Sequence, residues 1–543
     1  MLHRLKNWFA GAGVRRRGEA PAAIPSGVAA ARTPLEIALS ASPDDADLNY
    51  RMGLNHLAEG DAAGALDCFH LALHYAPDLF PACVARVRAL LALGRSSEEA
   101  GAYREFLQAN PGHAGAAYAL AAWHHARSEH ETAAELLRPL VDLRPPNREA
   151  CNLLGLILGR EFGEFEEGER LLRLALEPDP LWPVALSNLG WILLEKGEYV
   201  QGMKLLDAVL ARDPDDHETR LVRSYMNLKH GEFEQGWRDY EARHHSRFAM
   251  RPPYHFAQWD GTPLGGETLL IYAEQGFGDQ IMFASCFHEA IERAGRCIIE
   301  CDPRLVALFR RSFPTAVIEA SAPAGVQAAW TVSAQAVHRQ IPMGSLPGLF
   351  RERWEEFPRH AGYLRAAPER VAYWRARLDA LGPEPKIGLS WRGGIPATRR
   401  HLRSLAPEEL LPLLRLPARF VSLQYGNCSD DLDALRSDHG VILPHWQEAI
   451  DDYDETAALV CALDLVVSVC TAVIHLTGAL GRPVWILVPA VAEWRYLDAG
   501  ERLPWYPSAR LFRQMEPGRW RGVIQQIVEQ LEQLPTLINH HQK

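Results

Sequence analysis

The sequence predicts an α-helical solenoid followed by a pair of doubly wound α/β domains. The solenoid is predicted by a proline that recurs through the first part of the chain. Its successive spacings are 34, 34, 34, 35 and 34 residues, given by Pro43, Pro77, Pro111, Pro145, Pro180 and Pro214. The α/β domains are predicted by the region after Phe256, where short apolar runs alternate with helical segments. That alternation is typical of parallel sheets covered by helices.

The recurring unit has the size of a helical hairpin, which must stack on its neighbours to bury its apolar face. A small residue stands twelve positions before the proline in four repeats, at Ala65, Ala133, Gly168 and Gly202, and Glu99 is the exception. A bulky apolar residue stands eight positions before it, at Phe69, Tyr103, Leu137, Leu172 and Leu206. A small residue opposite a large one allows two helices to pack closely.

A glycine recurs where the first helix of each hairpin is expected to end, at Gly60, Gly94, Gly163, Gly197 and Gly231. Together with the prolines, this pattern resembles the tetratricopeptide repeat over about residues 44–245. We therefore assign residues 36–248 to a tetratricopeptide-repeat solenoid. The sixth unit keeps Gly236 and Tyr240 but lacks a closing proline, so we expect it to cap the stack and dock onto the next domain. The concave groove is predicted to bind a protein or peptide, and a rigid spacer or dimerisation arm is the alternative.

The composition restricts the class of protein. With 57 Lys and Arg against 68 Asp and Glu, the net charge is −11, which gives no general reason to expect nucleic-acid binding. No apolar run reaches the ~18–20 residues that a transmembrane helix needs. The nine cysteines show no metal-binding spacing, and Cys297 and Cys301 are expected to be buried thiols. We therefore predict a reducing, cytoplasmic setting and no metal site.

The N-terminal segment differs from the rest of the chain. Basic residues surround Leu2, Leu5, Trp8 and Phe9, and an Ala/Pro/Gly-rich stretch follows. The segment has no continuous apolar core of the kind that a secretory signal contains. This composition predicts a disordered basic tail over residues 1–35. The alternative is a short amphipathic helix within residues 1–17 that makes weak contact with a membrane surface.

Two sets of buried strands are predicted in the second half. The first set has strands at 268–273 and 296–300, and a third at Trp330–Ser333. The loop EQGFGDQ at 274–280 joins the first strand to a helix that begins near Ile281. A strand, a glycine-rich loop and a helix in this order place backbone N–H groups and a helix N-terminus at the carboxyl edge of a sheet.

The second set has four predicted strands, at 386–391, 419–424, 464–469 and 482–488. Cys470 and Thr471 form a tight turn after the third of these strands, and a helix is expected from Ala472 to Leu480. A helical crossover at 346–385 separates the two sets. The sequence thus predicts two Rossmann-like halves that face a cleft, at 255–345 and 386–535.

The α/β region resembles the lipopolysaccharide heptosyltransferase-like glycosyltransferases. The resemblance lies in EQGFGDQ at 274–280 and SVCTAVIHLTGALGRPVWILVP at 468–489, and it covers about residues 255–535. The stretch Asp498–Gln514 also resembles a bacterial subgroup that joins such a domain to tetratricopeptide repeats. The resemblance implies a GT-B fold and an inverting, metal-independent transfer of a sugar from a nucleotide-activated donor, with no cofactor. The acceptor is expected to be a protein or glycan held by the repeats.

Inverting transfer needs a base that accepts the proton of the acceptor hydroxyl, and positive charge or N–H groups that stabilise the departing phosphate. Asp279 matches the aspartate of the family's glycine loop and is the candidate base. Its alternative role is to cap the helix that begins near Ile281, because aspartate is a favoured cap. Gly278, directly before it, is expected to border the donor site.

The resemblance implies that residues at one helix N-terminus contact the donor's phosphates, namely Thr471, Ala472 and His475. Arg392 and Arg403 are predicted to act as cationic clamps on the donor. Arg399 and Arg400 are either further clamps or part of a solvated basic face. Gln424, at the end of its strand, is expected to face the nucleotide.

Cys470 departs from the pattern of the family, which usually has aspartate directly before the threonine. A neutral thiol lacks the hydrogen-bonding reach of a carboxylate. At this donor-contacting position the change is compatible with altered donor choice, with weaker binding or with a non-catalytic relative. The glycine loop, Thr471 and His475 favour an enzyme. The alternative is a non-catalytic scaffold that binds protein partners through its repeats and carries a degenerate α/β region.

Overall fold

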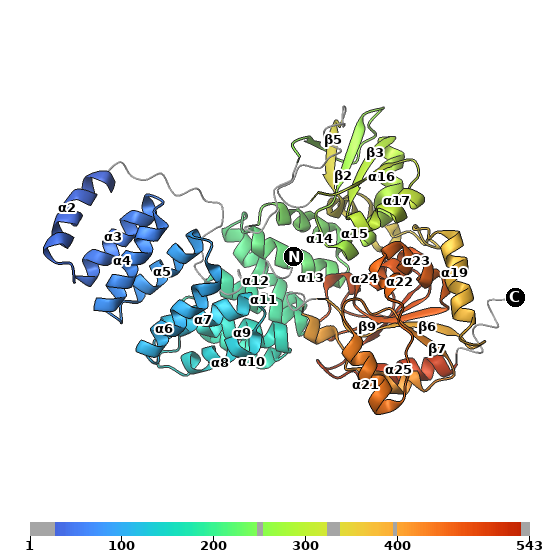
Figure 1. Cartoon of the computed structure of the whole chain (residues 1–543). Coiled ribbons are helices and arrows are strands. Elements are labelled where there is room, and N and C mark those ends of the chain that lie inside the picture. Colours follow the sequence, from blue (N-terminus) through green and yellow to red (C-terminus); the bar gives the residue numbers. More distant parts are fainter. Residues whose placement is uncertain (1–27, 247–253, 323–336, 395–398, 534–543) are drawn as a thin grey trace. The chain divides into compact units, whose positions relative to one another are not determined.

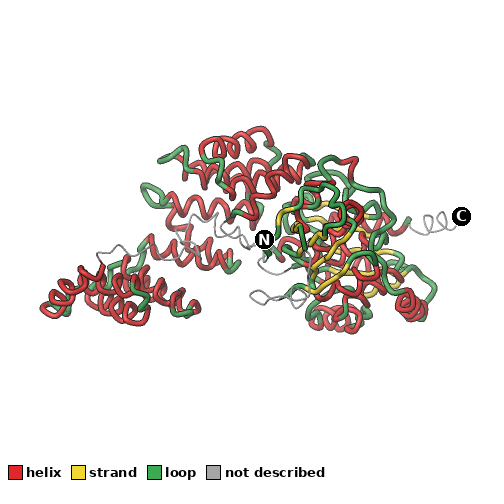
Figure 2. Tube along the Cα trace, turned by 90° about the horizontal axis from the view of Figure 1, so that it is seen from above, coloured by secondary structure: helices red, strands yellow, loops and turns green. Residues whose placement is uncertain are grey.

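The computed structural model describes residues 28–246, 254–322, 337–394 and 399–533. Its contacts divide the chain into two compact units, with the division between Leu205 and Leu206. The described part of the first unit contains only helices, and the second unit contains two parallel five-stranded sheets with their helices. Figure 1 labels the helices and strands and colours them in chain order. Figure 2 shows strands, in yellow, only in the α/β region.

The first unit is a series of helical hairpins. Its helices are α2 (Val28–Ala41), α3 (Ala46–Ala58), α4 (Ala62–Tyr75), α5 (Phe80–Ala92), α6 (Glu99–Ala109), α7 (Ala114–Ala126), α8 (His130–Val141), α9 (Arg148–Ile157), α10 (Phe165–Leu176), α11 (Pro183–Glu195) and the start of α12 (Tyr199–Arg212). Helix α3 packs on α4, α5 on α6, α7 on α8, and α9 on α10. The marker prolines lie in the links between hairpins, as predicted; Pro77, for example, separates α4 from α5.

The turn glycines have the backbone conformation that the hairpin requires. Gly60, Gly94, Gly163 and Gly197 have φ angles of 85°, 74°, 74° and 84°, in the region that favours glycine. The third hairpin has Ser128 at this position, with φ of 68°. The predicted small residues allow backbones to touch: a Cβ added to Gly168 would lie 2.8 Å from the carbonyl oxygen of Gly155.

The single spacing of 35 residues has a structural cause. It separates Pro145 from Pro180, and the turn position also moves by 35 residues, from Ser128 to Gly163. In the overlap of these two intervals, α9 continues into a π-helical turn at Leu158–Phe162. Such a turn closes over one more residue than an α-helical turn does. The inserted residue is therefore absorbed inside one helix, and the repeat then resumes its period.

The predicted N-terminal tail, residues 1–35, overlaps a helix. Helix α2 begins at Val28, so the segment 28–35 is helical rather than part of a disordered tail. The residues 1–27, including the candidate membrane-contacting segment 1–17, lie outside the described residues. Among those that are described, no helix is both long enough and apolar enough to span a membrane.

The sixth hairpin belongs to the second unit and packs on the α/β region. It consists of α13 (His217–His230), α14 (Phe233–Tyr240) and a 3₁₀ turn at Glu241–His244. The indole Nε1 of Trp237 donates to the carbonyl oxygen of Arg351 at 2.9 Å. The Trp237 ring also lies edge-on to Trp494, with 5.4 Å between centroids. The predicted docking of this hairpin is therefore confirmed.

The first sheet contains β1 (Ala257–Gln258), β2 (Thr268–Tyr272), β3 (Arg296–Cys301), β4 (Val317–Ala320) and β5 (Arg339–Pro342), in the order β1-β5-β2-β3-β4. Helices α15 (Phe277–Phe283) and α16 (Phe287–Ala294) connect β2 to β3, and α17 (Val306–Ser312) follows β3. The strand order reverses beside β2, which pairs in parallel with both β3 and β5. The predicted strand Trp330–Ser333 lies outside the described residues.

The second sheet contains the four predicted strands and one more. These are β6 (Lys386–Ser390), β7 (Arg419–Ser422), β8 (Leu465–Val469), β9 (Val484–Val488) and β10 (Ala509–Arg513). The parallel order β10-β9-β8-β6-β7 is doubly wound and reverses between β6 and β8. The remaining helices are α18 (Pro347–Phe350), α19 (Pro368–Asp379), α20 (Leu411–Leu414), α21 (Ser429–His439), α22 (Gln447–Asp451), α23 (Tyr453–Ala462), α24 (Ala472–Ala479) and α25 (Arg521–Glu532).

Seven of the nine cysteines are buried. All nine thiols are free, and Cys297 and Cys301 are both buried in β3, as predicted. Burial raises the pKa of each of these two thiols to about 12. They are therefore neutral side chains that fill the core of the first sheet.

Candidate functional site

The glycine loop lies at the switch point of the first sheet, where ligands of doubly wound domains bind. It follows β2, and α15 begins already at Phe277, with Gly276 as the residue that precedes its first turn. Asp279 lies inside that first turn. The alternative that Asp279 caps the helix is therefore wrong, and its carboxylate is available for another partner.

That partner is Arg495, which follows β9 in the second half. Its Nη2 donates to Oδ1 of Asp279 at 2.6 Å, and its Nη1 donates to the carboxylate of Glu493. The side chains of Arg495 and Asp279 are 15% and 22% exposed. Although burial lowers the pKa of Arg495, the negative charge of Asp279 raises it, and the net pKa is above its ordinary value. The guanidinium is thus charged and joins the two halves.

The switch point of the second sheet lies where β6 and β8 end. A Cβ added to Gly393, just after β6, would lie 3.0 Å from the carbonyl oxygen of Cys470, just after β8. Nη1 of Arg403 donates to this same carbonyl oxygen at 3.2 Å and to Oε1 of Glu493 at 3.3 Å. Glu493 therefore binds both cations, Arg403 and Arg495.

A narrow pocket opens at this edge of the second sheet. It is lined by Arg399, Leu402, Arg403, Cys470, Pro489, Val491, Glu493 and Tyr496. Its volume is about 10 Å³, which is room for about one water molecule. The Nε of Arg495 is buried and has no hydrogen-bond partner among the described residues. The Nε–H group of Arg495 is therefore available to a ligand at this edge of the sheet. The side chain of Glu493, which pairs with both arginines, lines the pocket.

The glycine loop also contacts the helix that follows β8. Thr471 precedes α24, and Ala472 is its first residue. A Cβ added to Gly278 would lie 3.3 Å from Cδ2 of His475 and 3.5 Å from Cα of Ala472. The structure thus brings together Gly278, Thr471, Ala472 and His475, which lie far apart in the sequence. A side chain at position 278 would therefore press against α24 and require His475 to shift by a few tenths of an ångström.

His475 is a buried neutral side chain. It is 5% exposed, and its Nδ1 lies 3.0 Å from the hydroxyl oxygen of Tyr506. Burial lowers the pKa of His475 well below its ordinary value, and the positive charges of Arg495 and Arg403 lower it further. Its predicted contact with a donor phosphate would therefore be made by a neutral imidazole at physiological pH.

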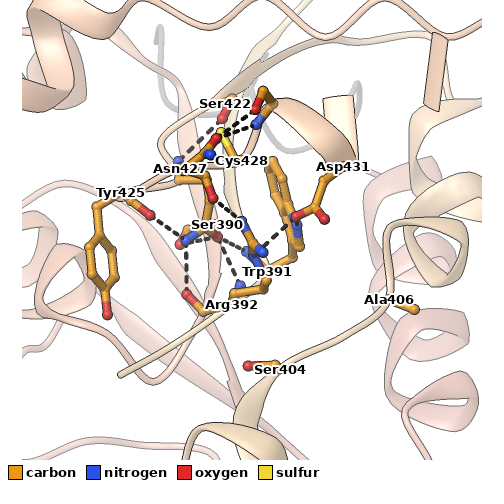
Figure 3. A network of polar contacts seen from close by, with 12 residues as sticks. Ser390, Trp391, Arg392, Ser404, Ala406, Ser422, Tyr425, Asn427, Cys428 and Asp431 are labelled. Atoms are coloured by element: carbon orange, nitrogen blue, oxygen red, sulfur yellow. Dashed lines mark hydrogen bonds and ion pairs between the residues drawn. The ribbon is translucent and has the colours of Figure 1, made fainter. Parts of the chain in front are cut away.

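Gln424 holds the loop after β6 in place. Its Oε1 accepts from the backbone N–H groups of Trp391 and Arg392 at 3.0 and 2.8 Å, and its Nε2 donates to two carbonyl oxygens of the same region. Figure 3 shows this polar network, in which the indole of Trp391 donates to the carboxylate of Asp431 at 2.8 Å. Gln424 is 2% exposed, so this side chain orders the edge of the site.

The basic residues of the predicted clamp separate into different environments. The guanidinium of Arg392 contacts Asp431 at 3.0 Å and the carbonyl oxygen of Asn427 at 2.6 Å, within the network of Figure 3. Arg399 is buried, with φ of 57°, and lines the pocket, so it is not part of a solvated face. Arg400 is half-buried. Arg403 and Arg399 are thus the predicted arginines that reach the pocket.

The thiol of Cys470 is buried and unreactive. It is 2% exposed, and its Sγ lies 3.5 Å from the carbonyl oxygen of Leu487, to which it donates. Burial raises the pKa of Cys470 to about 11. The side chain therefore faces the sheet, while the carbonyl oxygen of Cys470 is the group that meets Arg403.

Two charged residues of the site were missed at the sequence level, Glu493 and Arg495. They lie five and seven residues after β9, just before the stretch Asp498–Gln514 that carried part of the resemblance. Charged residues soon after a parallel strand are the signal that could have found them, because such residues reach the carboxyl edge of the sheet. Among the described residues, no group of three His, Cys, Asp or Glu side chains is arranged to hold a metal.

Comparison with known proteins found similarity over most of the chain. No protein-family model matches it. Protein FlbA of Caulobacter vibrioides is 29% identical over 496 residues, which cover 87% of this chain and 82% of FlbA. Because 496 residues exceed either compact unit, the similarity to FlbA includes parts of both.

Solved structures of tetratricopeptide-repeat proteins match part of the chain. The tetratricopeptide-repeat protein YrrB, which has an unusual peptide-binding site, is 19% identical, covering 34% of this chain and 95% of its own, with a TM-score of 0.28. A tetratricopeptide-repeat protein from Parabacteroides merdae is 18% identical, covering 41% of this chain and 88% of its own, with a TM-score of 0.33.

Proposed function

We propose that the chain is a glycosyltransferase that binds a nucleotide-activated sugar at the carboxyl edge of the second sheet. The observation that carries this proposal is the 2.6 Å ion pair between Asp279, at the switch point of the first sheet, and Arg495, which follows β9 of the second sheet. A candidate base from one half thereby lies next to a cationic edge of the other half. Sugar transfer needs these two functions side by side.

In this proposal the chain has a GT-B fold and inverts the anomeric centre. Asp279 accepts the proton of the acceptor hydroxyl as that oxygen attacks the anomeric carbon, and the bond from this carbon to the donor phosphate breaks. Arg403, Arg495 and the backbone N–H groups at the start of α24 stabilise the negative charge of the departing phosphate. The guanidinium groups supply this charge in place of a metal ion. The helical hairpins hold the acceptor, a protein or a glycan.

The pairing of Arg403 and Arg495 with Glu493 implies that a side chain must move when the donor binds. Glu493 binds both Arg403 and Arg495 in the structure, and the pocket beside them is narrow. A phosphate that binds here competes with the Glu493 carboxylate for the same cations. We therefore propose that donor entry moves the side chain of Glu493 away from Arg403.

The alternative is a scaffold that binds protein partners through its hairpins and has no transferase activity. It is favoured by the same pairing of charges, because Asp279 and Glu493 already offset the charges of Arg403 and Arg495 and so weaken their attraction for a phosphate. Cys470 also places a buried thiol at the position where the resembled family has a carboxylate.

Thermal-shift titration of the full chain with uridine, guanosine, cytidine and adenosine nucleotides and their sugar conjugates separates the two functions. Binding to the native state stabilises it, by about 2.7 kcal/mol at a ligand concentration one hundred times Kd. We expect one nucleotide class to raise Tm, and Arg403→Ala to abolish the rise. The matched control is Arg415→Ala, which removes an exposed arginine of the same half. No rise with any nucleotide, in folded protein, contradicts the proposed donor site and favours the scaffold.

A further inference from the structure

A buried guanidinium joins the sixth hairpin to the glycine loop. Arg243 lies in the 3₁₀ turn after α14, and its side chain is 3% exposed. Its Nε donates to both carboxylate oxygens of Glu274 at 3.1 Å, and its Nη2 donates to Oε1 at 2.7 Å. Nη1 donates to Oε1 of Glu241 at 2.7 Å, and Nη2 also donates to Oγ of Ser345 at 2.6 Å.

Glu274 is the first residue of the glycine loop and is separated from the end of β2 only by Ala273. Its Oε1 also accepts from the backbone N–H of Gly344, after β5, at 3.1 Å. A Cβ added to Gly344 would lie 2.4 Å from that oxygen, so any larger residue there would force the carboxylate to move. Three segments therefore meet at one carboxylate: the sixth hairpin, the glycine loop and the end of β5. This meeting point is the switch point of the first sheet.

The charges of this contact are buried together. Burial acts to lower the pKa of Arg243, but the negative charges of Glu274 and Glu241 raise it, and the net pKa lies above its ordinary value. The pKa of Glu241 is below its ordinary value, because Arg243 offsets the effect of burial. A planar fork that donates to a carboxylate from two nitrogens fixes its orientation as well as its distance. Lysine cannot reproduce this geometry.

We propose that Arg243 is a positioning residue that fixes the glycine loop, and with it Asp279, through Glu274. The inference rests on the proposed role of Asp279 as the base. Glu274 anchors the loop five residues before Asp279, and Arg495 binds Asp279 itself. A base must be held close to the productive geometry by residues that are themselves held in place. Through Arg243, the sixth hairpin therefore helps to position the glycine loop.

The chain offers a matched control for this contact. Arg223 in α13 makes the same kind of fork within the same hairpin, with Nε and Nη2 donating to Asp239 of α14 at 2.8 and 3.0 Å. It makes no contact with the glycine loop among the described residues. Arg223→Lys and Arg243→Lys thus remove the same chemical group from one hairpin, but only the second change releases the loop.

The first measurement is hydrogen–deuterium exchange of the full-length protein, followed in peptides that cover residues 274–283. Loosening a segment raises its exchange rate in proportion to the population of its open state. We expect exchange in these peptides to be about tenfold faster in Arg243→Lys than in the wild type. Arg223→Lys should leave it unchanged. Unchanged exchange in Arg243→Lys would overturn the anchoring role, whatever the protein's activity.

The second measurement is turnover of the nucleotide sugar that gives a thermal shift. Misplacing a catalytic group by about 1 Å costs up to about a hundredfold in rate, so kcat should fall about tenfold to a hundredfold in Arg243→Lys. The KM for the donor should not change, because the second half binds it. Glu274→Gln should give the same loss, and the double variant no further loss, since both act through one contact. Equal kcat losses in Arg243→Lys and Arg223→Lys would instead indicate a general structural effect and overturn the proposal.

If the wild type turns over no nucleotide sugar, the proposed function fails, and the exchange measurement alone decides whether Arg243 anchors the loop.

Discussion

Asp279 and Arg495 form an ion pair of 2.6 Å between the first turn of α15 and the segment after β9. The two residues are separated by 216 positions in the chain and belong to different sheets. Arg495 is also bound to Glu493, so one guanidinium serves two carboxylates. The removal of either carboxylate therefore changes the charge that the guanidinium presents to a ligand.

Replacement of Asp279 tests its role as the base. We expect Asp279→Ala to lower sugar transfer by about a hundredfold or more, which is the usual contribution of a general base. Nucleotide affinity should stay equal or increase, because Arg495 loses one of its two carboxylate partners. The measurement is a transfer assay combined with calorimetric titration of the nucleotide. Asp430→Asn, which neutralises an exposed aspartate of the second half, is the control. Undiminished turnover in Asp279→Ala would remove this residue from the mechanism.

Cys470 is predicted to be dispensable for the chemistry. With its pKa raised to about 11, roughly one thiol in a thousand is ionised at pH 8. We therefore expect no labelling of this cysteine by iodoacetamide at that pH in the folded protein, as read by mass spectrometry. Cys470→Ala should keep turnover within about threefold, since the contact with Arg403 is made by the backbone carbonyl. A loss of more than a hundredfold in a well-folded Cys470→Ala protein would show that the thiol itself takes part.

His475 should make the second unit less stable at mildly acidic pH. The pKa of His475 in the folded protein is well below the ordinary 6.5, so the unfolded chain binds a proton that the folded one does not. The stability from this group is complete above pH 6.5 and falls as the pH decreases below that value. Below pH 6.5, the free energy of unfolding of the wild type should fall by up to about 1.4 kcal/mol per pH unit more than that of His475→Asn.

Urea unfolding at pH 7.5, 6.5 and 5.5 measures this difference. His439→Asn, which replaces an exposed histidine at the end of α21, should follow the wild type at each pH. Parallel curves for the wild type and His475→Asn would mean that this imidazole titrates equally in both states.

Ser128 is expected to limit the stability of the third hairpin. It has φ of 68° at the position where other hairpins have glycine. A non-glycine residue in this conformation costs about 1 kcal/mol. We therefore expect Ser128→Gly to raise the free energy of unfolding of the full-length protein by up to about that amount, as measured by urea unfolding.

The reciprocal control is Gly94→Ser in the preceding hairpin. Gly94 has φ of 74°, and a Cβ added there would meet nothing within 4 Å. The substitution therefore changes only the energy of the backbone conformation. This variant should lose about as much stability as Ser128→Gly gains. A Ser128→Gly protein that is less stable than the wild type would show that the serine hydroxyl outweighs the backbone strain.

The repeat could be predicted almost in full because its determinants are local. Most hairpins depend on a turn residue, a linking proline and a small residue at fixed offsets, all within one period. The exceptions were equally local but ambiguous. The serine at the turn position did not indicate that its backbone would be left-handed. The one inserted residue did not indicate the π-helical turn at Leu158–Phe162 that absorbs it.

Six of the ten strands that the structure describes were predicted from their apolar runs, with ends that differ by one or two residues, whereas β1, β4, β5 and β10 were not predicted. The site was predicted only in part, because its residues come from separate loops. The order of strands in each sheet determines which loops are neighbours, and sequence spacing does not contain that order. Gln424, for example, ends its strand as expected, yet its amide is occupied by the backbone of the loop after β6.

The sequence by itself determined the helical repeat, the alternation of strands and helices, and the loops that carry polar residues. These depend on periodicity and on backbone preferences, which act between residues close in the chain. Only the tertiary structure decided that Asp279 pairs with Arg495, that Gly278 contacts α24, and that Arg243 binds the first residue of the glycine loop. Contacts of this kind depend on how sheets and hairpins pack, and many sequences with the same local pattern would pack differently.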